Sequence, residues 1–134
     1  MKKRILVVDD DPAILEYVTQ ILQSEHEVET AANANEAIEK LRTQEPFDLV
    51  LLDIELPDGT GYDVLSALRK SSQRDVPVVI VTCETRDEDV LRGYRQGADY
   101  YITKPFSPNR IANAVKFFIG DLPEQHKEEL AAEL

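Results

Sequence analysis

Residues 48–65, DLVLLDIELPDGTGYDVL, contain the pattern that decides the fold. A continuous apolar run over 49–52 ends at Asp53, and a turn rich in proline and glycine then leads into a helical apolar pattern near residue 61. An apolar run without alternation is typical of a strand buried on both faces, as in a parallel sheet. The stretch therefore predicts a strand, a turn and a helix, the repeating unit of an α/β protein.

The same unit recurs along the chain. Strand patterns lie at 5–8, 27–31, 49–52, 76–81 and 99–102, and helical patterns follow near 14–22, 34–44, 61–71, 86–96 and 111–119. Five such units predict one doubly wound α/β domain with a parallel five-stranded sheet. A chain of 134 residues, 43% of them apolar, is long enough for one core and too short for two ordinary domains. We place this domain at residues 1–120.

The last stretch of the chain, residues 121–134, differs in composition. Its sequence, DLPEQHKEELAAEL, has several acids and one lysine, with a thin apolar stripe. This pattern predicts an acidic, solvated helix or a linker. Gly120, directly before it, is typical of a left-handed C-terminal cap on the preceding helix.

Charge and cysteine content exclude several classes. A formal net charge of -11 argues against direct binding to nucleic acid or to anionic lipid. No apolar run is long enough for a membrane span and the N-terminus has no signal-peptide pattern, so we expect a cytoplasmic protein. Cys83 is the single cysteine, which excludes an internal disulfide and a CxxC metal site. Its place after an apolar run predicts a buried packing residue.

Polar residues follow the predicted strands at the end where α/β sheets bind ligands. An aspartate pair ends the first strand, Asp53 the third, a threonine the fourth and a lysine the fifth. Each has a plain alternative: a solvated turn for the pair, a β-former for the threonine and a surface side chain for the lysine. Their combination at four strand ends favours a functional site. The residues are Asp9, Asp10, Asp53, Thr82 and Lys104.

These residue types predict phosphoryl chemistry. Converging carboxylates repel one another unless a cation lies between them, and oxygen ligands favour magnesium. A carboxylate can attack phosphorus to form an acyl phosphate, which makes Asp53 the best-placed nucleophile. Lys104 would neutralise phosphoryl oxygens, and the Thr82 hydroxyl would bond one of them only after phosphorylation. Asp11 is better explained as a helix cap before Pro12.

Four motifs together resemble the receiver domain of bacterial two-component response regulators over roughly residues 4–119: VVDDDP, DLVLLDIELPDGTGYDVL, VPVVIVTCET and GADYYITKPF. The resemblance implies the flavodoxin-like strand order 2-1-3-4-5, as in chemotaxis regulators. It implies that Asp9 and Asp10 handle Mg2+, with Mn2+ as an alternative, and that Asp53 accepts the phosphoryl group. It also implies that the backbone carbonyl of Glu55 is a metal ligand.

The resemblance further implies how a signal leaves the site. Thr82 and Tyr101 would form a conformational switch, and a cis peptide bond before Pro105 would aim Lys104 into the pocket. The phosphoryl donor would be a histidine kinase or a histidine phosphotransfer protein. A downstream protein would bind the surface of the fourth helix, fifth strand and fifth helix, and a phosphorylation-dependent homodimer is a further expectation. A buried-core tyrosine remains the alternative for Tyr101.

Some residues depart from the family's commonest pattern. Cys83 stands where a smaller residue is usual, which predicts crowding and slower phosphoryl access. Glu55 and Glu84 lie two residues beyond the acceptor and the switch threonine, and their charge predicts slow hydrolysis of the aspartyl phosphate. Tyr100 stands where a second aspartate is usual, and Arg110 and Ala114 stand where glutamate and arginine are usual. These differences make the salt-bridged dimer of DNA-binding regulators doubtful.

Rival functions fit less well. An aspartate phosphatase would need a second aspartate where Glu55 stands, and a nucleotide-binding domain would need GxGxxG or a P-loop. A pseudo-receiver acting only by protein binding would be expected to lose one of the site residues, and all are present. We therefore expect a signalling domain rather than a metabolic enzyme. It acts either alone or as the receiver portion of a longer regulator or hybrid kinase.

Overall fold

The sheet of this protein is parallel and five-stranded. The computed structural model describes residues 2–43, 45–83, 86–120 and 124–133. The strand order is β2-β1-β3-β6-β7. Because β6 and β7 are the fourth and fifth strands of this sheet, the order 2-1-3-4-5 is confirmed. The strands are β1 (Lys3–Val8), β2 (His26–Ala31), β3 (Leu49–Leu52), β6 (Val78–Thr82) and β7 (Tyr100–Thr103), with a separate antiparallel hairpin of β4 (Glu55–Leu56) and β5 (Gly59–Thr60).

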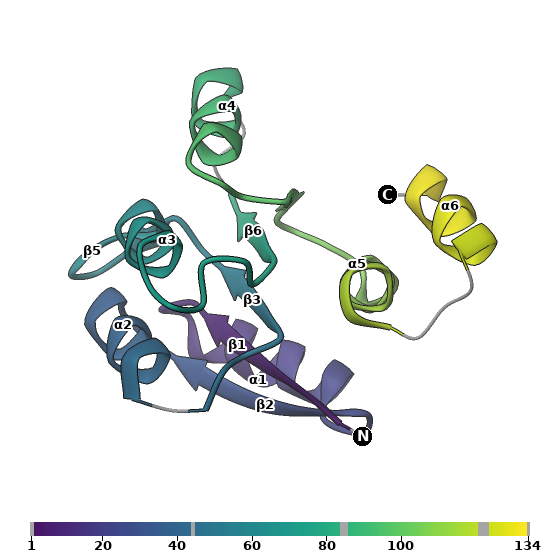
Figure 1. Ribbon diagram of the computed structural model, residues 1–134, viewed down its shortest axis with the longest axis horizontal. Coiled ribbons are helices and arrows are strands. Elements are labelled where there is room, and N and C mark those ends of the chain that lie inside the picture. Colours follow the sequence, from purple (N-terminus) through teal and green to yellow (C-terminus); the bar gives the residue numbers. More distant parts are fainter. Residues whose placement is uncertain (1, 44, 84–85, 121–123, 134) are drawn as a thin grey trace.

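Helices cover both faces of the sheet. One core cluster joins α1 and α5 to one face, and the other joins α2, α3 and α4 to the opposite face. Figure 1 shows α2 and α3 on one side of the central strands and α5 on the other. This is the doubly wound arrangement that the alternating periods predict. The helices are α1 (Pro12–Leu22), α2 (Ala34–Thr43), α3 (Gly61–Arg69), α4 (Asp87–Arg95), α5 (Pro108–Ile119) and α6 (Glu124–Glu133).

Local capping explains where the helices begin. The side chains of Asp11 and Ser107 accept backbone hydrogen bonds at the starts of α1 and α5, and a proline follows each. At α3, Thr60 and Asp63 form a reciprocal capping box. The left-handed cap predicted at Gly120 is wrong: its φ of -79° and ψ of 151° are extended. The chain leaves α5 in an extended direction, so a left-handed turn is not needed there.

The acidic segment after α5 contains a helix. α6 lies beside α5, away from the sheet (Figure 1). Its apolar stripe is thin, and Leu130 is only half-buried. In the part of the chain that the structure describes, no helix has the length and apolar character needed to cross a bilayer.

Candidate functional site

Four strand ends meet at one edge of the sheet. Asp9 and Asp53 follow the last residues of β1 and β3, Thr82 ends β6, and Lys104 follows β7. Parallel pairing brings these ends together: Val8 pairs with Leu52, and Thr82 pairs with Thr103. Together they line a cavity of about 260 Å3. The structure thus brings together the predicted residues Asp9, Asp10, Asp53, Glu55, Thr82, Cys83 and Lys104.

Lys104 lies between the two buried carboxylates. Its Nζ donates hydrogen bonds to Asp9 Oδ2 at 2.6 Å and to Asp53 Oδ2 at 2.8 Å. The Lys104–Pro105 peptide bond is cis, as the resemblance implied. Burial alone would lower the pKa of Lys104, but the hydrogen bonds to Asp53 and Asp9 outweigh it and raise that pKa. Lys104 therefore carries its full positive charge at neutral pH.

Each carboxylate is also fixed by a backbone amide. Asp11 N–H donates to Asp9 Oδ1 at 2.9 Å, and Glu55 N–H donates to Asp53 Oδ1 at 3.2 Å. Both side chains are nearly inaccessible to solvent. Burial raises the pKa of Asp9. The hydrogen bonds from Lys104 and Asp11 lower it in part, and the charge of Asp53 raises it further. A further positive charge in the cavity would therefore stabilise the ionised carboxylates.

The carboxylates fit a divalent cation. One oxygen from each of Asp9, Asp10 and Asp53 lies within 4.8 Å of the others. Asp10 is exposed, so the cluster is open to solvent on one side. Carboxylate oxygens with space left for water are the ligands that magnesium uses in proteins. Asp11, by contrast, caps α1 with its side chain, as the sequence indicated.

The two expected switch residues lie on neighbouring strands but in different surroundings. Thr82 is buried at the cavity, whereas Tyr101 lies in the core on the side of α2, α3 and α4. The Tyr101 ring is 6.4 Å from that of Tyr94 on α4. A Cβ on Gly93 would be 2.8 Å from Ile80 Cδ1 and 3.7 Å from the Tyr101 ring, so α4 packs tightly here. Tyr101 therefore contacts α4 rather than the cavity.

The prediction of a buried Cys83 is wrong. Cys83 is exposed, because β6 ends at Thr82 and the next residue already belongs to the loop at the rim of the cavity. Glu84, the other predicted modulator in this loop, lies outside the described residues. Glu55 is exposed beside the cavity.

The hairpin β4–β5 and the partners of Asp58 were not predicted. The Pro-Asp-Gly turn was visible, but two-residue strands give no periodic signal. Asp58 accepts backbone hydrogen bonds from Ala34 and Asn35 at the start of α2. The requirement for Gly61 was also hidden, because a Cβ there would lie 2.3 Å from the backbone oxygen of Asp53.

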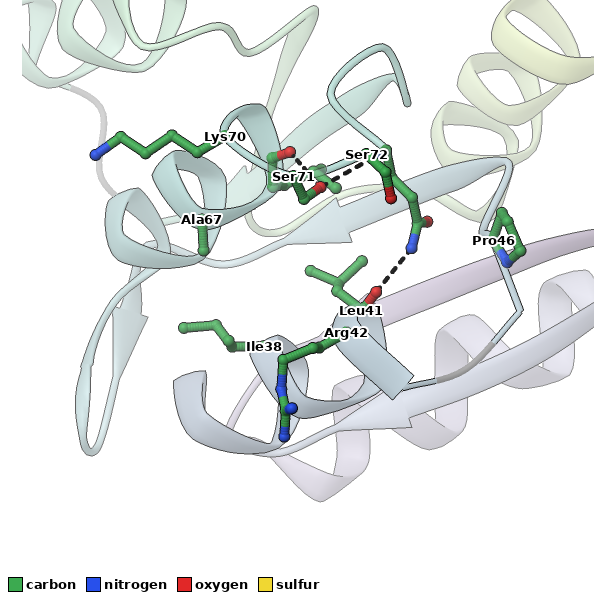
Figure 2. Close-up of a pocket in the computed structure, with 10 residues that line it drawn as sticks. Ile38, Leu41, Arg42, Pro46, Ala67, Lys70, Ser71 and Ser72 are labelled. Carbon is green, nitrogen blue, oxygen red and sulfur yellow. Dashed lines mark hydrogen bonds between the residues drawn. The ribbon is translucent and has the colours of Figure 1, made fainter.

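A larger cavity of about 460 Å3 lies at the other end of the sheet, between α2 and α3 (Figure 2). Its floor is apolar, with Leu41 and Leu68, and Figure 2 shows Lys70 pointing away from it. The amide of Gln73 is already bonded to Leu41 O and to Phe47 N–H. None of the described residues that line this cavity carries a carboxylate, so its size does not make it the chemical site.

Comparisons with known proteins agree with this geometry. MtrA of Mycolicibacterium smegmatis, a DNA-binding response regulator, is 41% identical over 117 residues, which are 87% of this chain and 50% of MtrA. The phosphate regulon transcriptional regulatory protein PhoB of Escherichia coli is 39% identical over 132 residues, 97% of this chain and 57% of PhoB. The chain thus spans about half the length of the curated relatives it matches.

Solved structures and the family model give the same result. A CheY-like response regulator receiver domain protein from Methanospirillum hungatei matches with a TM-score of 0.81 and 36% identity, covering 100% of both chains. The model of the response regulator receiver domain matches residues 5–116. This match takes in all four strand ends that form the acidic cavity. The chain therefore belongs to the family of response regulator receiver domains, which are signalling domains of two-component systems.

Proposed function

We propose that Asp53 accepts a phosphoryl group from a phosphohistidine, on a histidine kinase or a histidine phosphotransfer protein, in a magnesium-dependent reaction. One observation carries the proposal: the buried Asp53 carboxylate lies 2.8 Å from the Lys104 ammonium and within one carboxylate cluster with Asp9 and Asp10. A carboxylate oxygen of Asp53 attacks phosphorus. A P–O bond forms as the P–N bond to histidine breaks, and the imidazole keeps the electron pair of that bond.

The side chains around Asp53 have distinct roles in this proposal. Asp9, Asp10 and Asp53, with the backbone carbonyl of Glu55, would hold Mg2+ or Mn2+. The bound ion supplies charge neutralisation for the transferred group. Lys104, now shared by Asp9 and Asp53, would turn to the phosphoryl oxygens. The protein supplies position and charge, which is most of what phosphoryl transfer requires.

The phosphorylated state would be transmitted through Thr82 and Tyr101. Phosphorylation adds about -1.5 to -2 charges at pH 7, which draws the Thr82 hydroxyl and Lys104 toward Asp53. Tyr101 packs against the Tyr94 ring of α4, so a change at the end of β6 reaches α4 through it. α4 exposes Leu91 and Tyr94, which supports the α4–β7–α5 surface as the binding site for a downstream protein.

Relatives support a narrower, second proposal about output. MtrA and PhoB are named as DNA-binding and transcriptional regulators, so the partner of this receiver would be a DNA-binding domain. We propose a receiver at residues 1–120, acting in the cytoplasm, without direct contact to nucleic acid or membrane.

Arg110 is engaged within the chain, since its Nη2 donates to Tyr100 Oη at 2.9 Å. This bond supports the expectation that the usual salt-bridged dimer is doubtful for this chain.

The first experiment is intact-mass measurement after incubation with acetyl phosphate and Mg2+. We expect one phosphoryl group on the wild type and none on Asp53→Asn, with Asp75→Asn, an exposed aspartate far from the cavity, as the control that still gains it. Phosphorylation of Asp53→Asn would contradict the assignment. No gain in the wild type, with magnesium binding confirmed by calorimetry, would favour a receiver that acts only by protein binding.

The lifetime of the phosphorylated state is a separate expectation. Negative charge at Glu55 and Glu84 would disfavour an incoming water and slow hydrolysis. Glu55→Asn and Glu84→Ala should each accelerate loss of the phosphoryl group in a mass-based decay assay. If neither variant decays faster than wild type, these glutamates do not set the lifetime.

A further inference from the structure

The loop that follows Asp53 is held as a small hairpin. Glu55 pairs with Thr60, and Leu56 pairs with Gly59, so β4 and β5 enclose the turn at Pro57 and Asp58. The hairpin begins at Glu55, two residues after Asp53, and the Glu55 amide donates to the Asp53 carboxylate at 3.2 Å. A displacement of the hairpin therefore moves the backbone of Glu55 and changes the orientation of the Asp53 carboxylate.

Asp58 joins the turn of this hairpin to another helix. Its Oδ1 accepts from Ala34 N–H at 2.7 Å and its Oδ2 from Asn35 N–H at 2.9 Å. These amides lie in the first turn of α2, where they have no partner within the helix. The hydrogen bonds from Asn35 and Ala34 lower the pKa of Asp58, so the side chain is ionised and suited to the positive end of the helix.

The other end of the hairpin is also fixed, but by backbone. Gly61 N–H donates to Ile54 O at 2.7 Å, and there is no room for a side chain at Gly61 against the Asp53 carbonyl. Within the described residues, the hydrogen bonds that join the turn to α2 run through Asp58, while Leu56 of β4 packs in the core beside α2 and α3. Loss of the Asp58 bonds would leave the hairpin held by Leu56 and at its α3 end, so its tip would gain freedom.

We propose that Asp58 is a positioning residue for the phosphoacceptor site: by fastening the β4–β5 hairpin to α2, it holds the Glu55 carbonyl in place for the metal and the Glu55 amide on Asp53. The inference rests on the proposed function, since it assigns Asp58 a part in the same metal-dependent reaction. Residues that orient metal ligands without touching the metal change affinity by about 10- to 100-fold in known sites. Asp58 acts on a single backbone ligand, so about tenfold is the expected effect.

Magnesium affinity, measured by calorimetry on the full chain, tests the proposal. We expect Asp58→Ala to raise the Kd for Mg2+ about tenfold and Asp58→Asn, which keeps one acceptor oxygen, to raise it less. The matched control is Asn33→Ala. Asn33 Oδ1 accepts from Glu36 N–H at 2.8 Å, so this variant weakens the same end of α2 without touching the hairpin. It should lower the melting temperature and leave the Kd for Mg2+ unchanged.

Hydrogen exchange gives a readout that needs no metal. In metal-free protein, amides of residues 55–60 should exchange faster in Asp58→Ala than in wild type or Asn33→Ala. If wild type and Asp58→Ala have equal Kd values for Mg2+ and equal amide exchange rates, the positioning role of Asp58 is overturned while the proposed function stands. An equal loss of affinity in Asn33→Ala would also overturn that role, since Asp58 would then act only as a helix cap. A wild type that binds Mg2+ but is not phosphorylated would instead contradict the proposed function. If Asp58→Ala fails to fold, the same comparisons hold for Asp58→Asn.

Discussion

The two ends of the sheet satisfy their buried polar groups in different ways. At the carboxyl ends of the strands, Asp9, Asp53 and Lys104 depend on one another's charges. At the opposite end, Arg69 donates to the backbone oxygens of Val76 at 2.6 Å, Arg74 at 2.9 Å and Gly97 at 3.1 Å.

This difference separates a site that can change from a site that holds the fold. Most partners of Arg69 are backbone carbonyls, which neither titrate nor exchange partners with a bound ion; its ion pair with Asp99, at 3.1 Å, is partly exposed to solvent. The carboxylates of Asp9 and Asp53 share one ammonium, and a cation or a phosphoryl group would redistribute that charge. Magnesium and phosphorylation should therefore act at the carboxyl ends of the strands.

The largest effect is expected from Lys104→Met. Removing one member of a buried ionic cluster costs about 3–5 kcal/mol of unfolding free energy. Burial already raises the pKa of Asp9 in the folded wild type, and loss of the lowering hydrogen bond from Lys104 raises it further in the variant; protonation of Asp9 as pH falls through this raised pKa therefore restores more stability to the variant than to the wild type. Urea denaturation in EDTA should show the full deficit at pH 7, a smaller one near pH 5, and partial recovery at pH 7 with Mg2+.

The control for this variant is Lys116→Met, an exposed lysine on α5, which should change stability little at either pH. A Lys104→Met deficit that is the same at both pH values would mean that the carboxylates are not its cause.

A smaller loss is expected from Gly61→Ala. Its Cβ would lie 2.3 Å from Asp53 O and 2.9 Å from Ile54 Cα, both backbone atoms that cannot move aside cheaply. Overpacking of this kind costs about 1–3 kcal/mol or more. At Gly59 a Cβ would lie 3.0 Å from Asp63 Oδ2 and 3.8 Å from Ala34 Cβ, both side-chain atoms, so Gly59→Ala is the matched control. Equal melting temperatures for the two variants would argue against the close approach at Gly61.

At the opposite end of the sheet, Arg69→Ala should cost about 2 kcal/mol, because the part-buried carbonyls of Val76 and Gly97 lose a charged donor. This loss should be the same with and without Mg2+, and the phosphorylation rate with acetyl phosphate should not change. Arg95→Ala, at an exposed position on α4, is the control for loss of charge. A magnesium-dependent deficit in Arg69→Ala would show that the two ends of the sheet are coupled.

The smallest effect concerns Cys83→Ala. Because Cys83 is exposed, the change in unfolding free energy should be within about 0.5 kcal/mol. Its place at the rim of the cavity predicts a modest increase in the phosphorylation rate, measured by intact mass over time. A stability loss above 1 kcal/mol, on the scale of a core truncation, would mean that Cys83 packs after all.

Much of the fold could be predicted because its signals are local. The apolar runs of β1, β3 and β6, together with the caps Asp11 and Ser107, follow from neighbouring residues alone. Boundaries differ from the predicted ones by one or two residues: β1 begins earlier, at Lys3, and β2 at His26, whereas β6 spans Val78–Thr82 and β7 spans Tyr100–Thr103. The burial of Cys83 was mispredicted because an apolar run does not show where a strand leaves the core.

The sequence by itself determined which chemical groups follow each strand, since an aspartate, a threonine or a lysine after an apolar run is fixed by order along the chain. Only the tertiary structure decided which of them meet. The bonds of Lys104 to Asp9, 95 residues away, and of Asp58 to Ala34, 24 residues away, depend on how strands and helices are placed side by side. Periodicity describes one element at a time, whereas such contacts arise from the packing of several elements around a common core.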